Sequence, residues 1–301
     1  MITVEQHLAR ITDGVRPLPS EEVPIIDGVG RVLAEPLLAL HPVPPFTNSA
    51  MDGFAVRAAV ATPGVWLPVR GDVPAGPVEP APLEPGTAQR IMTGAPLPEG
   101  ADAIVPVEDT DQPRGPAPLP ERVRIDAAPV AGRFVRRAGE DVAPGAEVLP
   151  AGTLLTPAAV AAAISVGHGT ARVHRRPRVV VLSTGAELRP AGEPLEPGQI
   201  PDSNGPLLAA LARGEGAEVL YAASTGDGTE EFAAALHTAL AADVVVTSGG
   251  ASAGAFDVVK EVAEPLGVEF VEVAMQPGKP QGHGWLQPAP DGEVAGAAAG
   301  A

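Results

Sequence analysis

Residues 178–187 read Arg-Val-Val-Val-Leu-Ser-Thr-Gly-Ala-Glu, and this stretch sets the architecture of the second half of the chain. Its apolar run, Val179–Leu182, is typical of a parallel strand buried on both faces. Similar runs predict three more strands, with helical patterns between them: strands at 219–223, 243–247 and 268–273, helices at 204–211, 232–240 and 258–266. Asn204 and Thr229 are expected to cap the first two helices. The alternation predicts a doubly wound α/β sheet that binds ligands at the carboxyl ends of its strands.

The residues before this sheet predict two further parts. Residues 1–42 read as helical and begin with capping-box spacing at Thr3 and Gln6. Residues 43–135 are rich in Pro and Gly and carry short apolar runs that suit a small β domain (66–70, 88–92 and 104–107). A helix is expected from Thr156-Pro157 to Gly167. We therefore expect the β domain to interrupt an elongated linker or dimerisation domain made of 1–42 and 136–172.

The end of the chain differs from the α/β domain, which is expected over 173–285. Residues 286–301 contain only Leu286 and Val294 as large apolar side chains, so we expect a disordered tail. The loop Gln112–Pro120 is likewise expected to be a solvated tip.

Composition excludes several classes of function. Among 301 residues, 20 are Lys or Arg and 37 are Asp or Glu, so the net charge of −17 disfavours nucleic-acid binding. Cysteine is absent, which excludes disulfides, thiolate metal sites and cysteine nucleophiles. No apolar run is long enough to span a membrane, and the N-terminus lacks an export-signal pattern. We expect a cytoplasmic protein with no membrane contact.

Four loops of the α/β domain combine hydroxyls, glycines and charges suited to an anionic ligand. They are Ser183–Glu187, Thr225–Asp227, Thr247–Gly254 followed by Asp257, and Gln276–Pro280. Glu187, Asp227 and Asp257 offer the oxygen ligands that Mg²⁺ prefers. Each feature has a plain alternative: Asp257 as a helix cap, the two other carboxylates as solvated charges, and Lys279 as a surface lysine. From the residues alone, we predict an α/β domain for a nucleotide or phosphate ligand.

Longer strings resemble a known family. Pro44–Ala55 (Pro-Pro-Phe-Thr-Asn-Ser-Ala-Met-Asp-Gly-Phe-Ala) is similar to the signature of the molybdopterin molybdenumtransferases, which include bacterial MoeA and the gephyrin E domain. Further strings match that family in order and spacing: Thr93–Pro98, Gly139–Asp141, Leu182–Gly185, Asp202–Asn204, Ser248–Gly250 and Pro277–Pro280. The combination of the first string with Thr-Gly-Ala-Pro-Leu-Pro is very specific. The chain is identified by resemblance as a member of this family.

The resemblance implies a reaction and a homodimer. Family members cleave adenylated molybdopterin with Mg²⁺, release AMP, and insert molybdenum from molybdate into the dithiolene. The molybdopterin adenylyltransferase is a possible further partner. By resemblance, the catalytic residues are Asp52, Thr93, Glu187, Asp227 and Asp257, the last three being the metal ligands. The implied ligand-binding residues are Ser183, Thr184, Gly185, Asp202, Asn204, Ser248, Gly249, Gly250, Ser252, Lys279 and Pro280. Asp52 and Thr93 are expected to face the partner subunit's site.

The sequence departs from the family pattern in four single positions and at its end. Gln276 replaces a lysine of the molybdate loop, Ala186 replaces a common Asp, Phe54 a common Tyr, and His283 a usual aromatic. His283 is interpreted as a packing change. The sequence given lacks the family's Leu-Pro-Gly-Asn-Pro-Val-Ser string and its C-terminal β domain. On this basis 268–273 is expected to be an unpaired edge strand, and molybdenum insertion by this chain to be impaired.

Two alternatives stay open at this point. An adenylyltransferase that makes adenylated molybdopterin resembles residues 173–280, but the Asn-Ser-Ala-Met-Asp-Gly string and the inserted β domain argue against it. A dimeric binding or scaffold protein that kept the fold and lost catalysis is the other.

Overall fold

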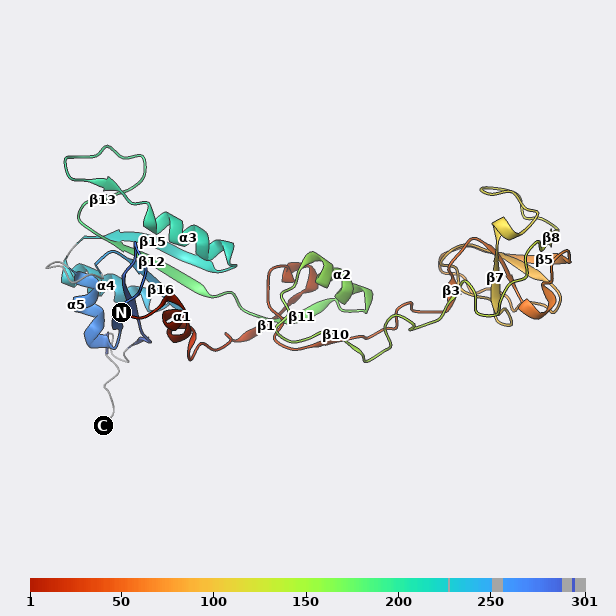
Figure 1. Ribbon diagram of the computed structural model, residues 1–301, viewed down its shortest axis with the longest axis horizontal. Helices are drawn as coiled ribbons and strands as arrows, with labels where there is room; N and C mark the ends of the chain where they lie inside the picture. The colour runs from red at the N-terminus through yellow and green to blue at the C-terminus, as the bar shows by residue number, and fades with distance from the viewer. Residues whose placement is uncertain (227, 251–256, 289–293, 296–301) are drawn as a thin grey trace. The chain divides into compact units, whose positions relative to one another are not determined.

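The computed structural model describes residues 1–226, 228–250, 257–288 and 294–295 (Figure 1). The chain forms two compact units, one of residues 1–21 and 173–301 and the other of residues 22–172. Each is described by itself. The finer division expected at residues 42/43 and 135/136 stays a prediction.

A three-stranded parallel sheet in the order β15-β12-β16 organises the first unit. Its central strand β12 (Arg178–Thr184) is the predicted buried strand, and it pairs with β15 (Glu218–Thr225) and β16 (Val244–Ser248). Three helices accompany it: α3 (Asn204–Gly214), α4 (Thr229–Ala239) and α5 (Val258–Ala263), the last continued by the 3-10 turn η4 (Glu264–Leu266). The predicted α/β fold of this part is confirmed.

Alternate residues of β12 pack against different helices. Val180 and Leu182 belong to a core cluster with Phe232 of α4 and Val258 of α5. Val179 and Val181 instead pack with Ala209 and its neighbours on α3. Because successive strand side chains point to opposite faces, α3 covers one face of the sheet and α4 with α5 cover the other (Figure 1). This explains the continuous apolar run in the sequence.

The strand expected at 268–273 has partners, so its expected unpaired edge is wrong. β17 (Glu269–Glu272) pairs in antiparallel fashion with β18 (Pro280–His283). The N-terminal residue Ile2 bonds on both sides of Val273, donating to Glu272 at 2.8 Å and accepting from Ala274 at 2.8 Å. Chain segments on either side thus satisfy the backbone groups that a bare edge would expose.

Helix ends show which capping predictions hold. α1 (Val4–Thr12) has the expected capping box, with Gln6 N bonded to Thr3 Oγ1 at 3.2 Å and Thr3 N to Gln6 Oε1 at 2.9 Å. The expectation that residues 1–42 are mainly helical is wrong, because α1 is followed by strands and one short 3-10 turn, η1 (Ile25–Gly28). Asn204 and Thr229 do not cap their helices: each is the first helical residue.

A five-stranded sheet in the order β7-β4-β6-β5-β8 forms most of the β region in the second unit. Its strands are β4 (Gly53–Val56), β5 (Trp66–Val73), β6 (Ala88–Ile91), β7 (Ala103–Pro106) and β8 (Arg122–Arg124). The three runs that predicted strands there are confirmed. Two 3-10 turns, η2 (Ala58–Val60) and η3 (Val107–Asp109), connect its strands.

The remaining elements are short. Helix α2 (Pro157–Ser165) begins as predicted, with Thr156 Oγ1 accepting from Ala159 N at 3.1 Å. Four two-stranded ladders complete the pairing: β1 (Ser20–Pro24) with β11 (Thr170–His174), β2 (Leu37–Leu38) with β10 (Glu147–Leu149), β3 (Asn48–Ser49) with β9 (Val135–Arg136), and β13 (Leu188–Arg189) with β14 (Ile200–Pro201).

The segment expected to be a disordered tail is described only in part. β19 (Gln287–Pro288) and β20 (Val294–Ala295) pair in antiparallel fashion, and the other residues beyond 288 lie outside the described ranges. None of the helices in the described ranges combines the length and apolar character needed to cross a bilayer.

Candidate functional site

Three hydroxyls are buried at the carboxyl end of the parallel sheet. Ser183 is 1% exposed, Thr184 5% and Thr225 6%. Among the described residues none of these three hydroxyl oxygens has a hydrogen-bond partner. A buried hydroxyl without a partner costs about 1–3 kcal/mol, so such groups ordinarily find one. Three together at the ligand-binding edge of an α/β sheet indicate groups held ready for a ligand.

The strand register explains why these side chains meet. β12 aligns Thr184 with Thr225 of β15, and Ser183 with Ser248 of β16. Gly185 N also donates to the Thr225 carbonyl at 3.3 Å. Because the three parallel strands end at the same level, three of the four predicted loops lie at one edge of the sheet.

Two glycines after β16 approach the same hydroxyl. A Cβ on Gly249 would lie 2.4 Å from the Thr184 carbonyl oxygen and 2.8 Å from Thr184 Oγ1. A Cβ on Gly250 would lie 3.0 Å from that hydroxyl. Both glycines have positive φ, 94° and 59°, which favours glycine. The Ser-Gly-Gly string thus lets backbone come close to β12 where any side chain would collide.

Asp202 performs the capping that the sequence assigned to Asn204. Its Oδ1 accepts from Gly205 N at 3.0 Å at the start of α3. A Cβ on Gly205 would meet Asp202 Oδ2 at 2.6 Å and Ser183 Oγ at 2.8 Å, so the start of α3 packs closely on β12. Asp202 and Ser183 are therefore neighbours, and Asn204 is left without the capping role.

The expected metal ligands are only partly described. Glu187 is exposed and folds back toward Gly185, where a Cβ would lie 2.6 Å from its Oε2. Asp257 stands at the N-cap position of α5 without a side-chain capping bond to the helix. Asp227 and Ser252 lie outside the described residues. Within the described ranges, no three His, Asp or Glu side chains are grouped to hold a metal.

Lys279 lies on the β17–β18 hairpin and is paired with a carboxylate. Its Nζ is 3.1 Å from Glu272 Oε1, and both side chains are roughly half exposed. Its carbonyl accepts from Val273 N at 2.7 Å, and Pro280 opens β18. The predicted oxyanion-binding lysine thus has an ion-pair partner that the sequence did not suggest.

Asp52 and Thr93 meet in the other unit. Asp52 Oδ1 accepts from Thr93 N at 2.6 Å and from Thr93 Oγ1 at 2.7 Å. The backbone bond, followed by the hydroxyl bond, lowers the pKa of Asp52. Asp52 is therefore ionised at neutral pH, with one oxygen fixed by Thr93. The two strings that carried the family resemblance in this region converge on this contact.

Other site features lacked a usable sequence signal. Thr225 was noted only as part of a loop, and nothing in the sequence marked its hydroxyl as unpartnered. Of the departures from the family pattern, Phe54 is buried at 2% exposure, and His283 makes an edge-on ring contact with Trp285 at 6.0 Å between centroids. That contact agrees with a packing role for His283.

Family models match nearly the whole chain. Residues 2–167 match the MoeA N-terminal region (domains I and II), and residues 180–294 match a probable molybdopterin binding domain. The chain is 46% identical to molybdopterin molybdenumtransferase 2 of Mycobacterium tuberculosis, over 94% of this chain and 72% of that protein. It is 37% identical to the molybdopterin molybdenumtransferase of Bacillus subtilis, over 92% of this chain and 66% of that protein.

Solved structures agree. The molybdopterin biosynthesis MoeA protein of Pyrococcus horikoshii aligns in one structure with a TM-score of 0.80 at 27% identity, covering 94% of this chain and 72% of that one. A second solved structure, of a molybdopterin biosynthesis MoeA protein also from Pyrococcus horikoshii, aligns with a TM-score of 0.78 at 35% identity, with 94% of this chain and 71% of that one covered. On these matches, and on the strings around Asp52 and Thr93, the chain belongs to the molybdopterin molybdenumtransferase family, whose transferases act in molybdenum cofactor biosynthesis.

Proposed function

We propose that this protein inserts molybdenum from molybdate into adenylated molybdopterin and releases AMP. The observation that carries the proposal is the set of unpartnered hydroxyls of Ser183, Thr184 and Thr225 at the carboxyl end of the sheet. Hydroxyls can donate to phosphate oxygens or accept from ring N–H groups, so they suit a ligand that has both. The acidic chain must bind this anionic substrate through local donors.

The adenylated pterin would lie over β12 and its neighbours. Gly249 and Gly250 let their backbone pack closely beside Thr184, and their loop would offer backbone donors to the substrate. Asp202 borders Ser183 through the start of α3. We place Ser183–Gly185, Asp202, Asn204, Ser248–Gly250 and Ser252 among the contacts of this substrate.

Mg²⁺ is proposed as the cofactor of adenylate cleavage. Glu187 and Asp257 supply carboxylate oxygens, and Mg²⁺ is commonly held by one or two carboxylates together with substrate phosphates. Asp227 would complete the set. Bound there, the ion would provide Lewis-acid stabilisation of charge on the phosphate. Asp227→Asn and Asp257→Asn should slow cleavage of bound adenylate more than they weaken its binding, and loss of binding with unchanged cleavage would contradict the metal role.

Molybdate is the proposed second substrate, with Lys279 and Pro280 at its site. The Lys279 ammonium is a point charge suited to an oxyanion. A dianion must be desolvated, so several donors are needed to offset that cost. Gln276 offers a neutral amide where the family has a lysine, so this chain should bind molybdate more weakly than relatives with both lysines.

A homodimer with a shared site is proposed on the family resemblance, which implies that Asp52 and Thr93 face the partner subunit's site. Mixing an Asp52→Ala chain with an Asp257→Ala chain should restore activity in mixed dimers. A strictly monomeric protein at micromolar concentration would overturn this arrangement. The cytoplasm is the proposed setting, with the molybdopterin adenylyltransferase as supplier of the substrate.

One experiment separates the proposed function from a binding or scaffold role. Purified protein is given adenylated molybdopterin, and binding is measured alongside molybdate-dependent formation of the cofactor and release of AMP. The transferase should show all three. Tight binding without AMP release or cofactor formation would support the scaffold alternative. In a separate assay with ATP and free molybdopterin, formation of the adenylate with release of pyrophosphate would indicate an adenylyltransferase.

A further inference from the structure

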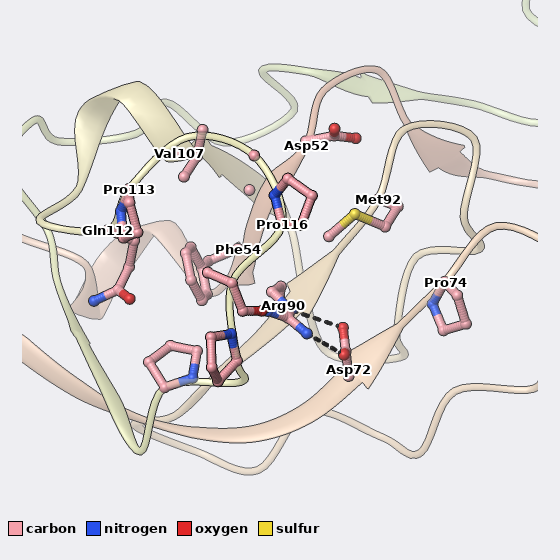
Figure 2. Close-up of a pocket in the computed structure, with 15 residues that line it drawn as sticks. Asp52, Phe54, Asp72, Pro74, Arg90, Met92, Val107, Gln112, Pro113 and Pro116 are labelled. Atoms are coloured by element: carbon pink, nitrogen blue, oxygen red, sulfur yellow. Dashed lines mark hydrogen bonds and ion pairs between the residues drawn. The ribbon is translucent and has the colours of Figure 1, made fainter.

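A cavity of about 440 Å³ lies in the β region of the second unit. Its floor is the sheet, with Phe54 on β4, Arg90 on β6 and Asp72 on β5. The proline-rich loop 112–120 forms the opposite wall, and Asp52 lies at the rim (Figure 2). Most of this loop is exposed, as expected of a solvated tip, and one side of it also lines the cavity. The volume falls in the range of about 300–1,000 Å³ that holds small molecules.

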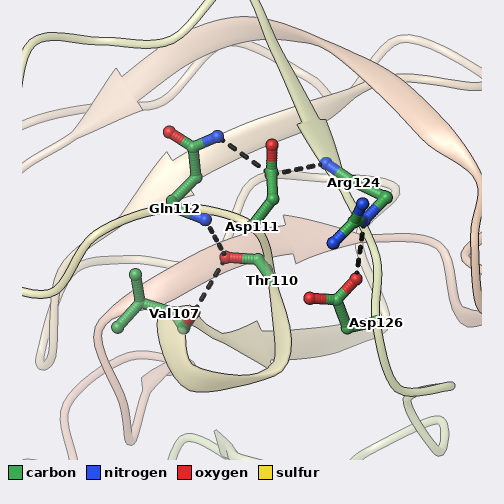
Figure 3. A network of polar contacts seen from close by, with 6 residues as sticks. All are labelled: Val107, Thr110, Asp111, Gln112, Arg124 and Asp126. Atoms are coloured by element: carbon green, nitrogen blue, oxygen red, sulfur yellow. Dashed lines mark hydrogen bonds and ion pairs between the residues drawn. The ribbon is translucent and has the colours of Figure 1, made fainter.

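Two sets of bonds hold the loop in place. Arg90 Nη1 donates to the Ala117 carbonyl at 2.7 Å, which ties the far part of the loop to β6. At its base, Gln112 N donates to Thr110 Oγ1 at 3.2 Å, and Gln112 Nε2 donates to Asp111 Oδ1 at 2.9 Å (Figure 3). Asp111 Oδ1 also accepts from Arg124 N at 2.9 Å. These bonds thus hold the wall of the cavity in place in the absence of a ligand.

The cavity has many acceptors and few donors to offer a ligand. Arg90 is its only cation among the described lining residues, and all three guanidinium nitrogens already donate, two to Asp72 and one to Ala117. The four prolines at 113, 116, 118 and 120 have no N–H groups. Acceptors are the Asp52 carboxylate, whose Oδ2 has no recorded partner among the described residues, the Gln112 amide oxygen, and loop carbonyls. An anion would meet a net negative lining whose one described cation, Arg90, is already paired with Asp72 and keeps only two of its five N–H groups free.

We propose that this cavity binds an uncharged planar heterocycle that carries an exocyclic amine, such as adenine or a pterin ring. The ring would lie over the sheet between Met92 and the prolines, and its amine would donate to Asp52 and the loop acceptors. This binding step goes beyond the proposed function and does not depend on it. If the proposed function also holds, one of the two rings of adenylated molybdopterin is the natural occupant.

The test uses adenosine, AMP and free pterin as probes of the whole chain, with binding measured by calorimetry. Pro116→Trp places a bulky side chain at the cavity, whereas Leu119→Trp alters an exposed residue of the same loop that does not line it. We expect adenosine or pterin to bind the unmodified chain, Pro116→Trp to weaken that binding at least about tenfold, and Leu119→Trp to change it less than about twofold. AMP should bind no better than adenosine, because the phosphate finds no free cation.

Several outcomes would overturn the proposal. They are the absence of binding by both ring probes, equal losses in the two tryptophan variants, and a clear preference for AMP over adenosine. Comparing the binding of adenosine with that of free pterin shows which ring the cavity accepts. The proposed function can fail separately. If the protein binds these rings at the cavity but forms no cofactor, the cavity proposal stands and the proposed transferase activity is wrong.

Discussion

The two ends of the parallel sheet differ in how their buried polar groups are paired. At the amino end, Asp243 accepts from Arg175 Nη1 and Nη2 at 2.5 and 2.6 Å and from Arg178 N at 2.8 Å. Arg178 Nε, which makes no hydrogen bond, still lies 3.6 Å from Asp243 Oδ2. At the carboxyl end, the Ser183, Thr184 and Thr225 hydroxyls have no partner within the described chain.

This difference distinguishes the polar contacts that stabilise the sheet from those that are available to bind a ligand. An ion-paired cluster such as that of Asp243 with Arg175 stabilises the folded state, although Arg178 Nε beside it makes no hydrogen bond, and removing a member leaves other charges unpaired. An unsaturated cluster lowers stability until something binds it. The same three strands therefore have one end that serves stability and another that serves recognition, and each can be tested by substitution.

The largest expected effect is on ligand binding, from Gly249→Ala. The new Cβ would lie 2.4 Å from the Thr184 carbonyl, so the loop must move away from β12. Gly267→Ala is the matched control, because its φ of 96° is nearly the same and nothing lies within 4 Å of its Cβ. Backbone strain should cost each variant about 1 kcal/mol of stability, and Gly249→Ala should lose more than Gly267→Ala because of its collision with the Thr184 carbonyl. We expect only Gly249→Ala to weaken binding of adenylated molybdopterin, by about a hundredfold or more. Equal binding by the two variants would remove the glycine loop from the site.

The next effect is on stability and concerns Asp243→Asn. Hydrogen bonds from Arg175 lower the pKa of Asp243 well below its ordinary 3.8, outweighing the effect of burial, and the Arg178 N–H adds to this. Because the folded-state pKa is depressed, the carboxylate stabilises the fold above about pH 4 and this contribution fades as pH falls further. The variant should lose about 3 kcal/mol at pH 7.

Chemical denaturation at pH 7 and at about pH 3 measures this difference. The gap between the two proteins should narrow in acid, and binding of the adenylated pterin at neutral pH should change little in protein that remains folded. A gap that stays constant with pH would mean that shape, and not charge, makes Asp243 stabilising.

Thr184→Val tests the other end and should have the opposite sign. The valine keeps the shape of threonine and removes a hydroxyl that lacks a partner, so stability should stay level or rise by up to about 1 kcal/mol. Binding of the adenylated pterin should weaken by about tenfold, the value of one hydrogen bond. Thr93→Val is the contrast, since that hydroxyl donates to Asp52 and its loss should not stabilise the protein. A clear loss of stability in Thr184→Val would show that the hydroxyl has a structural partner.

Sequence patterns predicted the sheet better than its polar contacts. The apolar run Val179–Leu182 was enough to place a central strand, because burial on both faces leaves few other compositions. The cap of α3 was assigned wrongly because Asp202 and Asn204 are both good capping residues two positions apart, and only the turn before the helix decides between them. The strand near residue 270 found its partners in Ile2 and β18, which are contacts that strand periodicity does not encode.

The same limit applies to the candidate sites. Motif strings pointed to Asp52 and Thr93, which do meet, and to the loops after β12 and β16. No string marks a hydroxyl as unpartnered, because that property depends on every neighbour in space. The composition of 112–120 predicted a solvated loop, and most of it is exposed, but the composition did not indicate that its prolines line a cavity together with Arg90 and Asp72. The sequence likewise did not predict the Lys279–Glu272 ion pair, which forms across the β17–β18 hairpin.

That pair gives the smallest expected effect, from Glu272→Gln. In the free protein Glu272 competes with any oxyanion for Lys279, and its own negative charge repels molybdate. The exposed ion pair itself is worth at most about 1 kcal/mol, so the fold should not change measurably. Removing the charge should raise the affinity for molybdate or tungstate about two- to fivefold, with the gain declining as salt screens the repulsion. Calorimetry at low and high ionic strength measures this, with Glu269→Gln on the same strand as the matched control. Glu269 lies 3.9 Å from Arg10 Nη2 in an exposed ion pair and is not paired with Lys279, so its variant should show a smaller gain. Equal gains in both variants would mean that the overall charge of the hairpin, and not the contact with Lys279, sets the affinity.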